Sequence, residues 1–216
     1  MQQIREAVLP APSLEWLGMV EYESMWQRMQ LRAEDLGEGQ ADEVVWACEH
    51  APVYTTGRRG VDNRRQAELP APLLRTDRGG ETTFHGPGQL LLYPVLHLRA
   101  RRIGVRDYVC LLEQSCIDLL RGYGLQAGRR EGLPGIWLGE NKIASIGLRV
   151  SHGVAWHGMA LNVQVDAHWF DAINACGAGL GVTSMAAHVQ SPPLAELADA
   201  WYALLCAGLA RPLHGP

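Results

Sequence analysis

The sequence predicts an α+β fold, in which one mixed and largely antiparallel sheet has helices packed against one side of it. Three stretches, at about 21–36, 105–122 and 194–209, carry apolar residues at helical spacing. The strand-like runs between them are short, and several follow one another directly across tight turns. Strands joined by a tight turn must run antiparallel, so a sheet of such pairs with separate helices favours the α+β class.

Length and composition favour a single domain. The chain has 216 residues and 47% hydrophobic content, which is enough for a full core, so we expect one domain over residues 1–216. Its formal net charge of -4 gives no global electrostatic reason to bind nucleic acid. The first residues lack the pattern of a secretion signal, and no run of about 18 apolar residues could span a membrane. We therefore expect a cytoplasmic protein that binds neither nucleic acid nor membranes.

The first half of the chain predicts one helix and two main strands. Apolar residues from Tyr22 to Leu36 recur on one helical face, and Gly37 ends that helix. The run EVVWACE at 43–49 predicts a buried strand. The run LLLYPVLHL at 90–98 predicts another. Its Pro94 indicates a sheet edge or a bulge, because proline has no N–H to donate to a ladder.

The second half predicts two helices and three further strands. The helix at 105–122 places Cys116 in the core and leaves Cys110 half-buried. The segment 135–150 reads as two strands around a turn at 139–141, and 154–165 as a third strand after a turn at 151–153. A last helix follows at 194–209.

Among the five cysteines, Cys176 has a distinctive setting. The number is odd and no pair forms a C-x-x-C, so neither a disulfide framework nor a zinc knuckle is indicated. Cys176 lies in the glycine-rich stretch INACGAGLG, where no periodicity buries it. A nearby base would raise its thiolate fraction, and the following glycine N–H groups could hold an oxyanion. The others are expected to be packing residues: Cys48, Cys110, Cys116 and Cys206.

Lys142 is the only lysine in the chain. Alternation along the strand would place it on the same face as Ala144, Ile146, Leu148 and Val150, and that face is apolar. A lysine there needs a partner, or a pKa lowered by burial toward the range of a general base. The alternative is a lysine at a strand end that reaches into water.

The stretch RGGETTFHGPGQ at 78–89 has more glycines and polar side chains than a turn requires, which indicates that another molecule approaches it. His85 is predicted to line a pocket, and His157 to be a hydrogen-bonded core or pocket histidine. A zinc site made of Cys176, His85 and His157 is the weaker interpretation, because their spacings are scattered.

Other motifs are less specific. Arg58, Arg59, Arg64 and Arg65 form either a solvated loop or a docking patch for an acidic partner. The chain has no P-loop, and two partial dinucleotide fingerprints, from Gly86 and from Gly177, lack the final glycine.

Five motifs in order resemble those of the octanoyltransferase family, which passes an octanoyl group from acyl carrier protein to a lysine of lipoyl domains. They are EHAPVYTTG, RGGETTFHGPGQ, NKIASIGLRV, HGMALNV and INACG. They lie between about residues 49 and 184, which is most of the chain.

The resemblance implies a fold related to biotin and lipoate protein ligases. It also implies that Cys176 carries the acyl group as a thioester and that Lys142 activates its thiol. The segments that resemble the family's substrate-binding regions are Arg78, Gly79, Gly80, Glu81, Thr82, Thr83, Phe84 and His85, then Ser145, Ile146 and Gly147, then Gly158, Met159 and Ala160. One residue departs from the family pattern: Ala175 precedes the cysteine where proline is common.

The implied donor is octanoyl-acyl carrier protein, and the implied acceptors are lipoyl domains of 2-oxoacid dehydrogenase complexes and the glycine cleavage H protein. A thioester is already an activated acyl donor, so no cofactor, ATP or metal is expected. A monomer is expected as well. Two alternatives remain: an ATP-dependent lipoate or biotin ligase of the same fold, and a noncatalytic carrier-binding module in which Cys176 is dispensable.

Overall fold

The structure is a computed structural model that describes residues 9–60, 69–173 and 181–211. Its main feature is a seven-stranded sheet in the order β1-β2-β6-β10-β9-β8-β7. The strands of this sheet are β1 (Ser13–Val20), β2 (Val44–His50), β6 (Gln89–His97), β7 (Gly128–Arg130), β8 (Leu133–Leu138), β9 (Asn141–Ser151) and β10 (Val154–Asn162). Only β1 and β2 pair in parallel, and every other neighbouring pair is antiparallel. The α+β class and the mixed, largely antiparallel sheet are therefore confirmed.

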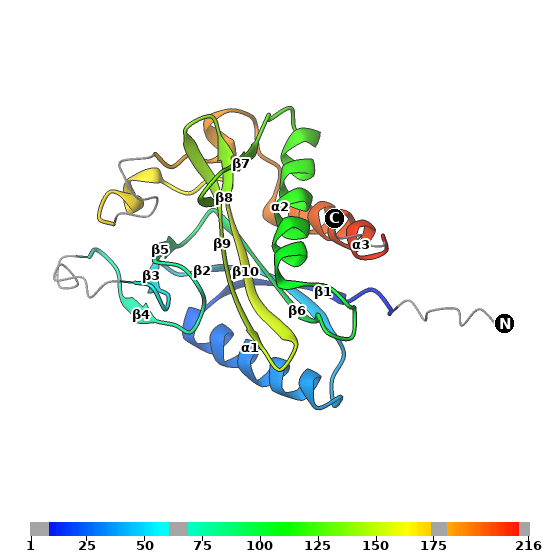
Figure 1. Ribbon diagram of the computed structural model, residues 1–216. Coiled ribbons are helices and arrows are strands. Elements are labelled where there is room, and N and C mark those ends of the chain that lie inside the picture. Colours follow the sequence, from blue (N-terminus) through cyan, green and yellow to red (C-terminus); the bar gives the residue numbers. More distant parts are fainter. Residues whose placement is uncertain (1–8, 61–68, 174–180, 212–216) are drawn as a thin grey trace.

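A second, three-stranded sheet has the order β4-β3-β5. It contains β3 (Val53–Thr56), β4 (Leu73–Arg75) and β5 (Thr82–His85), and it lies beside one end of the large sheet (Figure 1). These strands are not predicted from the sequence, because each has only three or four residues. The small sheet carries the glycine-rich stretch at 78–89 and is the part of the fold that places it.

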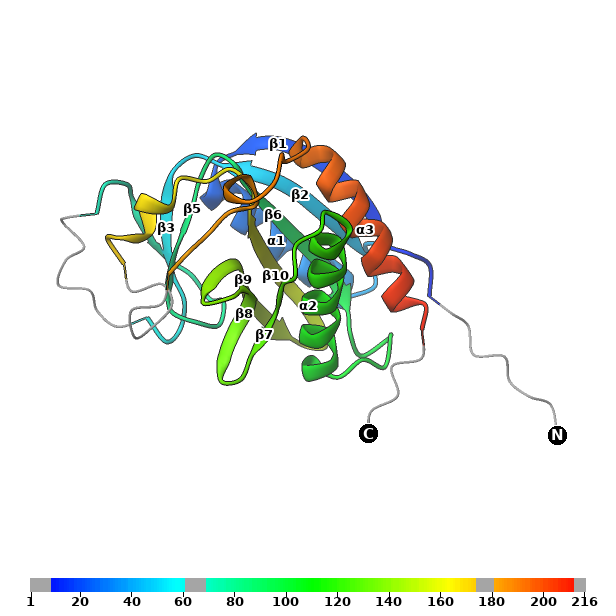
Figure 2. The same cartoon turned by 90° about the horizontal axis from the view of Figure 1, so that it is seen from above.

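The helices cover both faces of the large sheet, so the expectation of helices on one side is wrong. Helix α1 (Tyr22–Gly37) packs on one face, while α2 (Val105–Gly122) and α3 (Leu194–Leu209) pack on the other (Figures 1 and 2). Strand β2 shows why both faces need a cover. Its Trp46 belongs to the cluster under α1 and its Val45 to the cluster under α2 and α3. A strand that is apolar at consecutive positions is buried on both faces.

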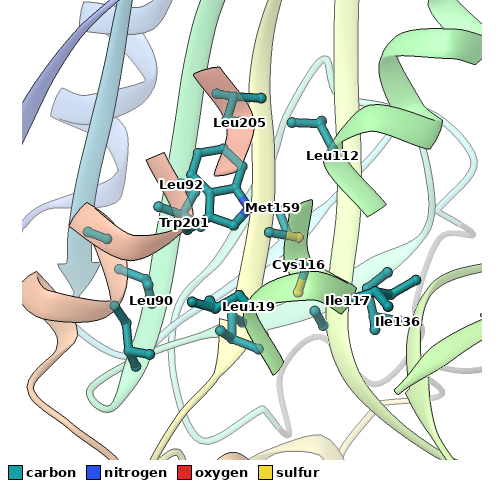
Figure 3. Packing of buried hydrophobic residues seen from close by; sticks show 14 of the residues in the cluster. Leu90, Leu92, Leu112, Cys116, Ile117, Leu119, Ile136, Met159, Trp201 and Leu205 are labelled. Carbon is teal, nitrogen blue, oxygen red and sulfur yellow. The ribbon is translucent and has the colours of Figure 1, made fainter. Parts of the chain in front are cut away.

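The larger core cluster lies between the sheet and the helix pair α2 and α3 (Figure 3). Cys116 from α2 and Trp201 from α3 are fully buried there against Leu92 and Met159 of the sheet. The core position of Cys116 is thus confirmed. Cys110, by contrast, is exposed rather than half-buried, because its position on α2 points away from this cluster.

Pro94 does not mark a sheet edge. Strand β6 is central, between β2 and β10. Its pairing with β10 is interrupted between Leu96–Ala155 and Leu92–Met159, and it resumes in the same register, so there is no bulge either. The interrupted stretch faces His157, whose φ of 59° is unusual for a residue in a strand. The missing N–H of proline is therefore accommodated by a local gap in one ladder.

Two tight turns join β8 to β9 and β9 to β10, as expected. Gly139 has φ of 61°, and His152 and Gly153 have φ of 50° and 88°. Positive φ at both central residues, as at 152–153, and at the first alone, as at Gly139, are the two geometries of a two-residue hairpin turn that match the twist of the two strands. None of the helices among the described residues is long and apolar enough to cross a membrane.

Candidate active site

A cavity of about 550 Å³ lies along β9 and β10, next to the loop that precedes β5 and the start of α2. Cavities of roughly 300–1,000 Å³ typically hold small ligands. Its lining includes nearly all the residues of the three segments expected to bind substrate, together with Lys142 and His157. The structure therefore brings together residues that are far apart in the sequence. Their role in binding a substrate stays a prediction.

Phe84 is the exception among those segments. It is fully buried and packs with Tyr54, Trp169 and Phe170 instead of lining the cavity. Alternation along β5 explains this, because neighbouring residues of a strand point to opposite faces. Phe84 therefore packs on the face of β5 that points away from the cavity, and the neighbouring His85 lines the cavity.

Arg78 places a buried positive charge at the cavity. Its Nη2 atom donates to the carbonyl oxygen of Thr55 at 2.7 Å and to the Thr55 hydroxyl at 2.8 Å, and its Nη1 atom donates to the Gly79 carbonyl at 2.9 Å. These acceptors are all neutral. Among the described residues Arg78 has no carboxylate within ion-pair distance. A buried guanidinium without a counter-ion suits a polar or anionic group of a ligand.

Two glycines make room for this arginine. A Cβ atom on Gly147 would lie 3.0 Å from Cδ of Arg78, and one on Gly57 would lie 2.6 Å from the Gly80 carbonyl oxygen. In addition, the backbone N–H of Gly79 donates to the Leu148 carbonyl at 2.8 Å, which fastens the loop to β9. The two glycines therefore allow the Arg78 side chain and the neighbouring backbone to come close, as glycines at a ligand site often do.

His85 lines the cavity, as the sequence predicted. Its Nδ1 atom is 2.8 Å from Oε1 of Gln89, and its ring stacks on Tyr22 at 5.6 Å between centroids. Burial and the nearby positive groups lower the pKa of His85 well below its usual value, so the ring is neutral at pH 7.

His157 is held by an acid. Its Nε2 atom is 2.8 Å from Oδ1 of Asp77, and the indole N–H of Trp26 donates to the same oxygen at 2.9 Å. Burial lowers the pKa of His157 although Asp77 opposes that shift. The expectation of a hydrogen-bonded pocket histidine is met at one ring nitrogen, while Nδ1 is buried without a hydrogen-bond partner.

Lys142 lies on a different face from the one the sequence predicted. Ala144 is opposite Ile136 on β8, whereas Lys142 is opposite Trp137, with one extra residue of β9 between the two pairs. Residues directly opposite each other share a face, and Ile136 and Trp137 are consecutive and so point to opposite faces. The bulge at this point therefore turns Lys142 away from Ala144 and the core.

The amine of Lys142 lies over an aromatic ring at the cavity. Nζ is 4.9 Å from the centroid of Trp137, and Lys142 is half-buried among the lining residues. Arg130 contacts the same ring at 5.2 Å. An aromatic face stabilises an ammonium group, so the ring favours the state of Lys142 after it has accepted a proton.

The backbone of Lys142 is tied to the segment that follows Cys176. The N–H of Lys142 donates to Gly181 at 2.9 Å, and the N–H of Thr183 donates to Lys142 at 3.0 Å, so the two segments form a parallel bridge. Cys176 and Ala175 lie outside the described residues. Gly181 follows Cys176 by five positions, which is a short tether between the predicted nucleophile and the predicted base.

Part of the lining was not predictable from the sequence motifs. Tyr22 and Tyr93 are among the lining residues. Tyr93 is the one hydroxyl-bearing residue in the apolar run of β6, a signal that could have marked it, and its hydroxyl is 2.9 Å from Nε2 of His50. The remaining missed residues are mostly apolar: Leu91, Val105, Val109, Gly132, Leu133, Pro134 and Leu148.

Among the four arginines of the predicted docking patch, Arg58 and Arg59 are exposed, and Arg59 reaches the cavity lining. Arg64 and Arg65 lie outside the described residues. Within the described ranges no three His, Cys, Asp or Glu side chains are grouped closely enough to hold a metal ion.

Comparison with known proteins assigns the family. Residues 21–205 match the lipoyl protein ligase A/B catalytic domain. An octanoyltransferase of Xanthomonas euvesicatoria is 48% identical over 180 residues, which cover 83% of this chain and 77% of that protein. An octanoyltransferase of Laribacter hongkongensis is 43% identical over 92% of this chain and 96% of its own length. The chain belongs to the octanoyltransferase family.

Solved structures show how this octanoyltransferase fold relates to that of ligases. A bipartite lipoate protein ligase of Thermoplasma acidophilum superposes with a TM-score of 0.69 at 17% identity, over 92% of this chain and 84% of its own. A biotin protein ligase of Aquifex aeolicus in complex with biotin and ATP has a TM-score of 0.58 at 12% identity, over 91% and 70% of the two chains. The expected fold, related to lipoate and biotin protein ligases, is confirmed.

Proposed function

We propose that this chain is a single catalytic domain that transfers an octanoyl group from octanoyl-acyl carrier protein to a lysine of lipoyl domains, through a thioester on Cys176. Family membership supports the reaction. The observation that carries the mechanism is the position of Lys142, whose side chain lines the cavity while its backbone is bonded to the segment just after Cys176.

In the first half-reaction Lys142 takes the proton of the Cys176 thiol. The thiolate attacks the carbonyl carbon of the donor thioester, a new C–S bond forms, and the bond to the carrier's sulfur breaks. The leaving thiolate then receives the proton from Lys142. Because the donor is already a thioester, this step requires neither ATP nor a metal.

In the second half-reaction the amine of the acceptor lysine attacks the acyl carbon on Cys176. The C–N bond forms, the C–S bond to Cys176 breaks, and the proton lost by the amine passes to the released thiolate through Lys142. Between the two steps the acyl chain is held by the apolar part of the cavity wall, which includes Val109, Leu133 and Met159. The Trp137 ring stabilises each ammonium state of Lys142.

The decisive experiment is intact mass spectrometry of the protein after incubation with octanoyl-acyl carrier protein, without ATP. We expect a protein species that carries one octanoyl group, and its loss when a lipoyl domain is added. A chain that modifies the lipoyl domain only from free octanoate and ATP would be a ligase instead. A chain that binds the carrier without becoming acylated or transferring the group would be a binding module.

We further propose that Arg58 and Arg59 steer the carrier protein toward the cavity, with Arg64 and Arg65 in the same patch. Reversing the charge of Arg58 and Arg59 to glutamate is expected to raise the KM for the carrier and to weaken its salt dependence, because exposed charges act mainly on encounter. The measurement is a salt series with octanoyl-carrier protein beside one with a small octanoyl thioester. Equal losses for both donors would indicate a folding defect rather than docking.

The remaining proposals concern the acceptor proteins, the oligomeric state and the cellular location. The proposed acceptors are lipoyl domains of 2-oxoacid dehydrogenase complexes and the glycine cleavage H protein. A monomer in the cytoplasm is proposed too, and the unpaired state of the four described cysteines supports a reducing compartment. Sedimentation of the purified protein checks the oligomeric state, and fractionation of cells checks the location.

A further inference from the structure

Three buried polar side chains and the backbone of a fourth buried residue, Thr183, connect His85 to the segment beside Lys142. The four residues are His85, Gln89, Asn162 and Thr183, and each has at most 8% of its surface exposed. Gln89 and Asn162 are directly opposite each other on β6 and β10, although 73 positions separate them in the sequence. Buried amides in such a position either satisfy one another or cost stability, so their hydrogen bonds define their orientation.

The direction of both amides follows from two backbone carbonyls, which can only accept. The Nδ2 atom of Asn162 donates to the Thr183 carbonyl at 3.1 Å, so its Oδ1 atom faces Gln89. Nε2 of Gln89 then donates to that oxygen at 2.8 Å and to the Phe84 carbonyl at 3.3 Å. Turning either amide over would place an oxygen against a carbonyl oxygen. Oε1 of Gln89 is thus the atom that remains toward His85.

This orientation specifies the tautomer of His85. Oε1 of Gln89 can only accept, so the Nδ1 atom of His85, 2.8 Å away, must carry the proton. In the neutral ring Nε2 is then an acceptor. The Nδ1 side of the ring is turned toward Gln89, so Nε2 lies on the opposite side of the ring, and His85 lines the cavity. The ring therefore offers a lone pair where a substrate would lie.

The far end of the chain of hydrogen bonds meets the predicted base. The Thr183 carbonyl accepts from Asn162, and the Thr183 N–H donates to the carbonyl of Lys142 at 3.0 Å. One set of buried bonds therefore orients His85 and also anchors the strand segment that holds Lys142.

We propose that Gln89 is a positioning residue that holds His85 in the Nδ1–H tautomer, so that His85 Nε2 accepts a hydrogen bond from an N–H group of a bound substrate. Asn162 is the second positioning residue, because it fixes the direction of the Gln89 amide. This inference rests on the proposed function for the identity of the substrate. The N–H group belongs either to an amide of the donor's thioester arm or to the amine of the acceptor lysine.

The test compares Gln89→Met and Gln89→Glu with the parent. Methionine has no acceptor for Nδ1–H, so the ring is expected to shift toward the other tautomer. Transfer is expected to fall about tenfold to a hundredfold, the range found when the partner that orients a metal-ligating histidine is removed. Glutamate keeps an acceptor and adds a negative charge, which raises the pKa of His85. In that variant Nε2 becomes protonated at a higher pH. The acidic limb of the pH–rate profile, where the rate falls as the pH is lowered, should therefore shift to higher pH.

Other groups around His85 also influence its titration. The titratable or charged groups facing it are Tyr22, His50, Arg78, Tyr93 and His157. None of them changes in these variants, so the shift of the limb between the parent and Gln89→Glu reports the new carboxylate. Ser115→Ala is the matched control, because Ser115 is equally buried and hydrogen-bonded but lies on α2, outside this network.

Nitrogen-15 NMR of labelled histidine reads the tautomer directly and does not depend on octanoyl transfer. A parent protein with Nε2–H on His85, or a Gln89→Met variant that keeps both tautomer and transfer rate, would overturn the proposal.

The rates of Cys176 acylation and of transfer to a lipoyl domain are measured separately. Loss in the first assigns the N–H group to the donor, and loss in the second assigns it to the acceptor. A parent that never becomes acylated would contradict the proposed function and leave the tautomer result standing.

Discussion

Replacing Cys176 with serine is expected to abolish the octanoyl-enzyme and to reduce transfer to background. A hydroxyl is far less acidic than a thiol, so Lys142 could not generate a comparable nucleophile from it. Intact mass after incubation with octanoyl-acyl carrier protein measures the intermediate, and a lipoyl-domain assay measures transfer. Full transfer by Cys176→Ser would contradict a covalent mechanism.

The other cysteines provide the controls. Burial raises the pKa of the thiols of Cys48 and Cys116, so neither is available as a thiolate. Cys110 is exposed and Cys206 is partly exposed, and neither lines the cavity. Substitution of each of the four by alanine or serine should leave the acyl-enzyme in place, with Cys116 as the one most prone to lower stability because it lies in the core.

The second large effect is expected for Lys142→Arg. Arginine keeps the positive charge near Trp137 but cannot give up or accept a proton at usable pH. General acid and base catalysis contributes about 10²–10⁴-fold in rate, and transfer should fall within that range while the fold is retained. The pH dependence of Cys176 alkylation in parent and variant measures the effect on the thiol itself.

Arg130→Gln is a matched control for Lys142→Arg. Arg130 contacts the same Trp137 ring but is not part of the cavity lining, so its loss should leave the rate and the pH profile nearly unchanged. Near-normal transfer by Lys142→Arg, together with an alkylation profile like that of the parent, would show that charge alone suffices. His85 would then be the next candidate for the base.

The helices could be predicted closely because their apolar periodicity is local. The predicted ranges 105–122 and 194–209 coincide with α2 and α3, and 21–36 differs from α1 by one residue at each end. The apolar residues of a helix do not specify which face of the sheet that helix covers. That choice depends on which strands are neighbours, and it is why the prediction of helices on one side failed.

The site was predictable in its residue types and only partly in its geometry. The single lysine, the glycine-rich loop and its histidine stand out in the sequence alone. The bulge that turns Lys142 away from Ala144 appears only when β8 is placed beside β9. Likewise, the contact between Gln89 and Asn162 requires β6 and β10 to be neighbours, which no local pattern reveals.

The bulge in β9 also separates two roles within one strand. It lets one strand serve two independent purposes, since Ala144 belongs to the large core cluster while Lys142 belongs to the cavity. A substitution at Ala144 is therefore expected to act mainly on the core, and one at Lys142 mainly on the cavity. Core packing and the predicted chemistry are thus assigned to nearby positions of a single strand.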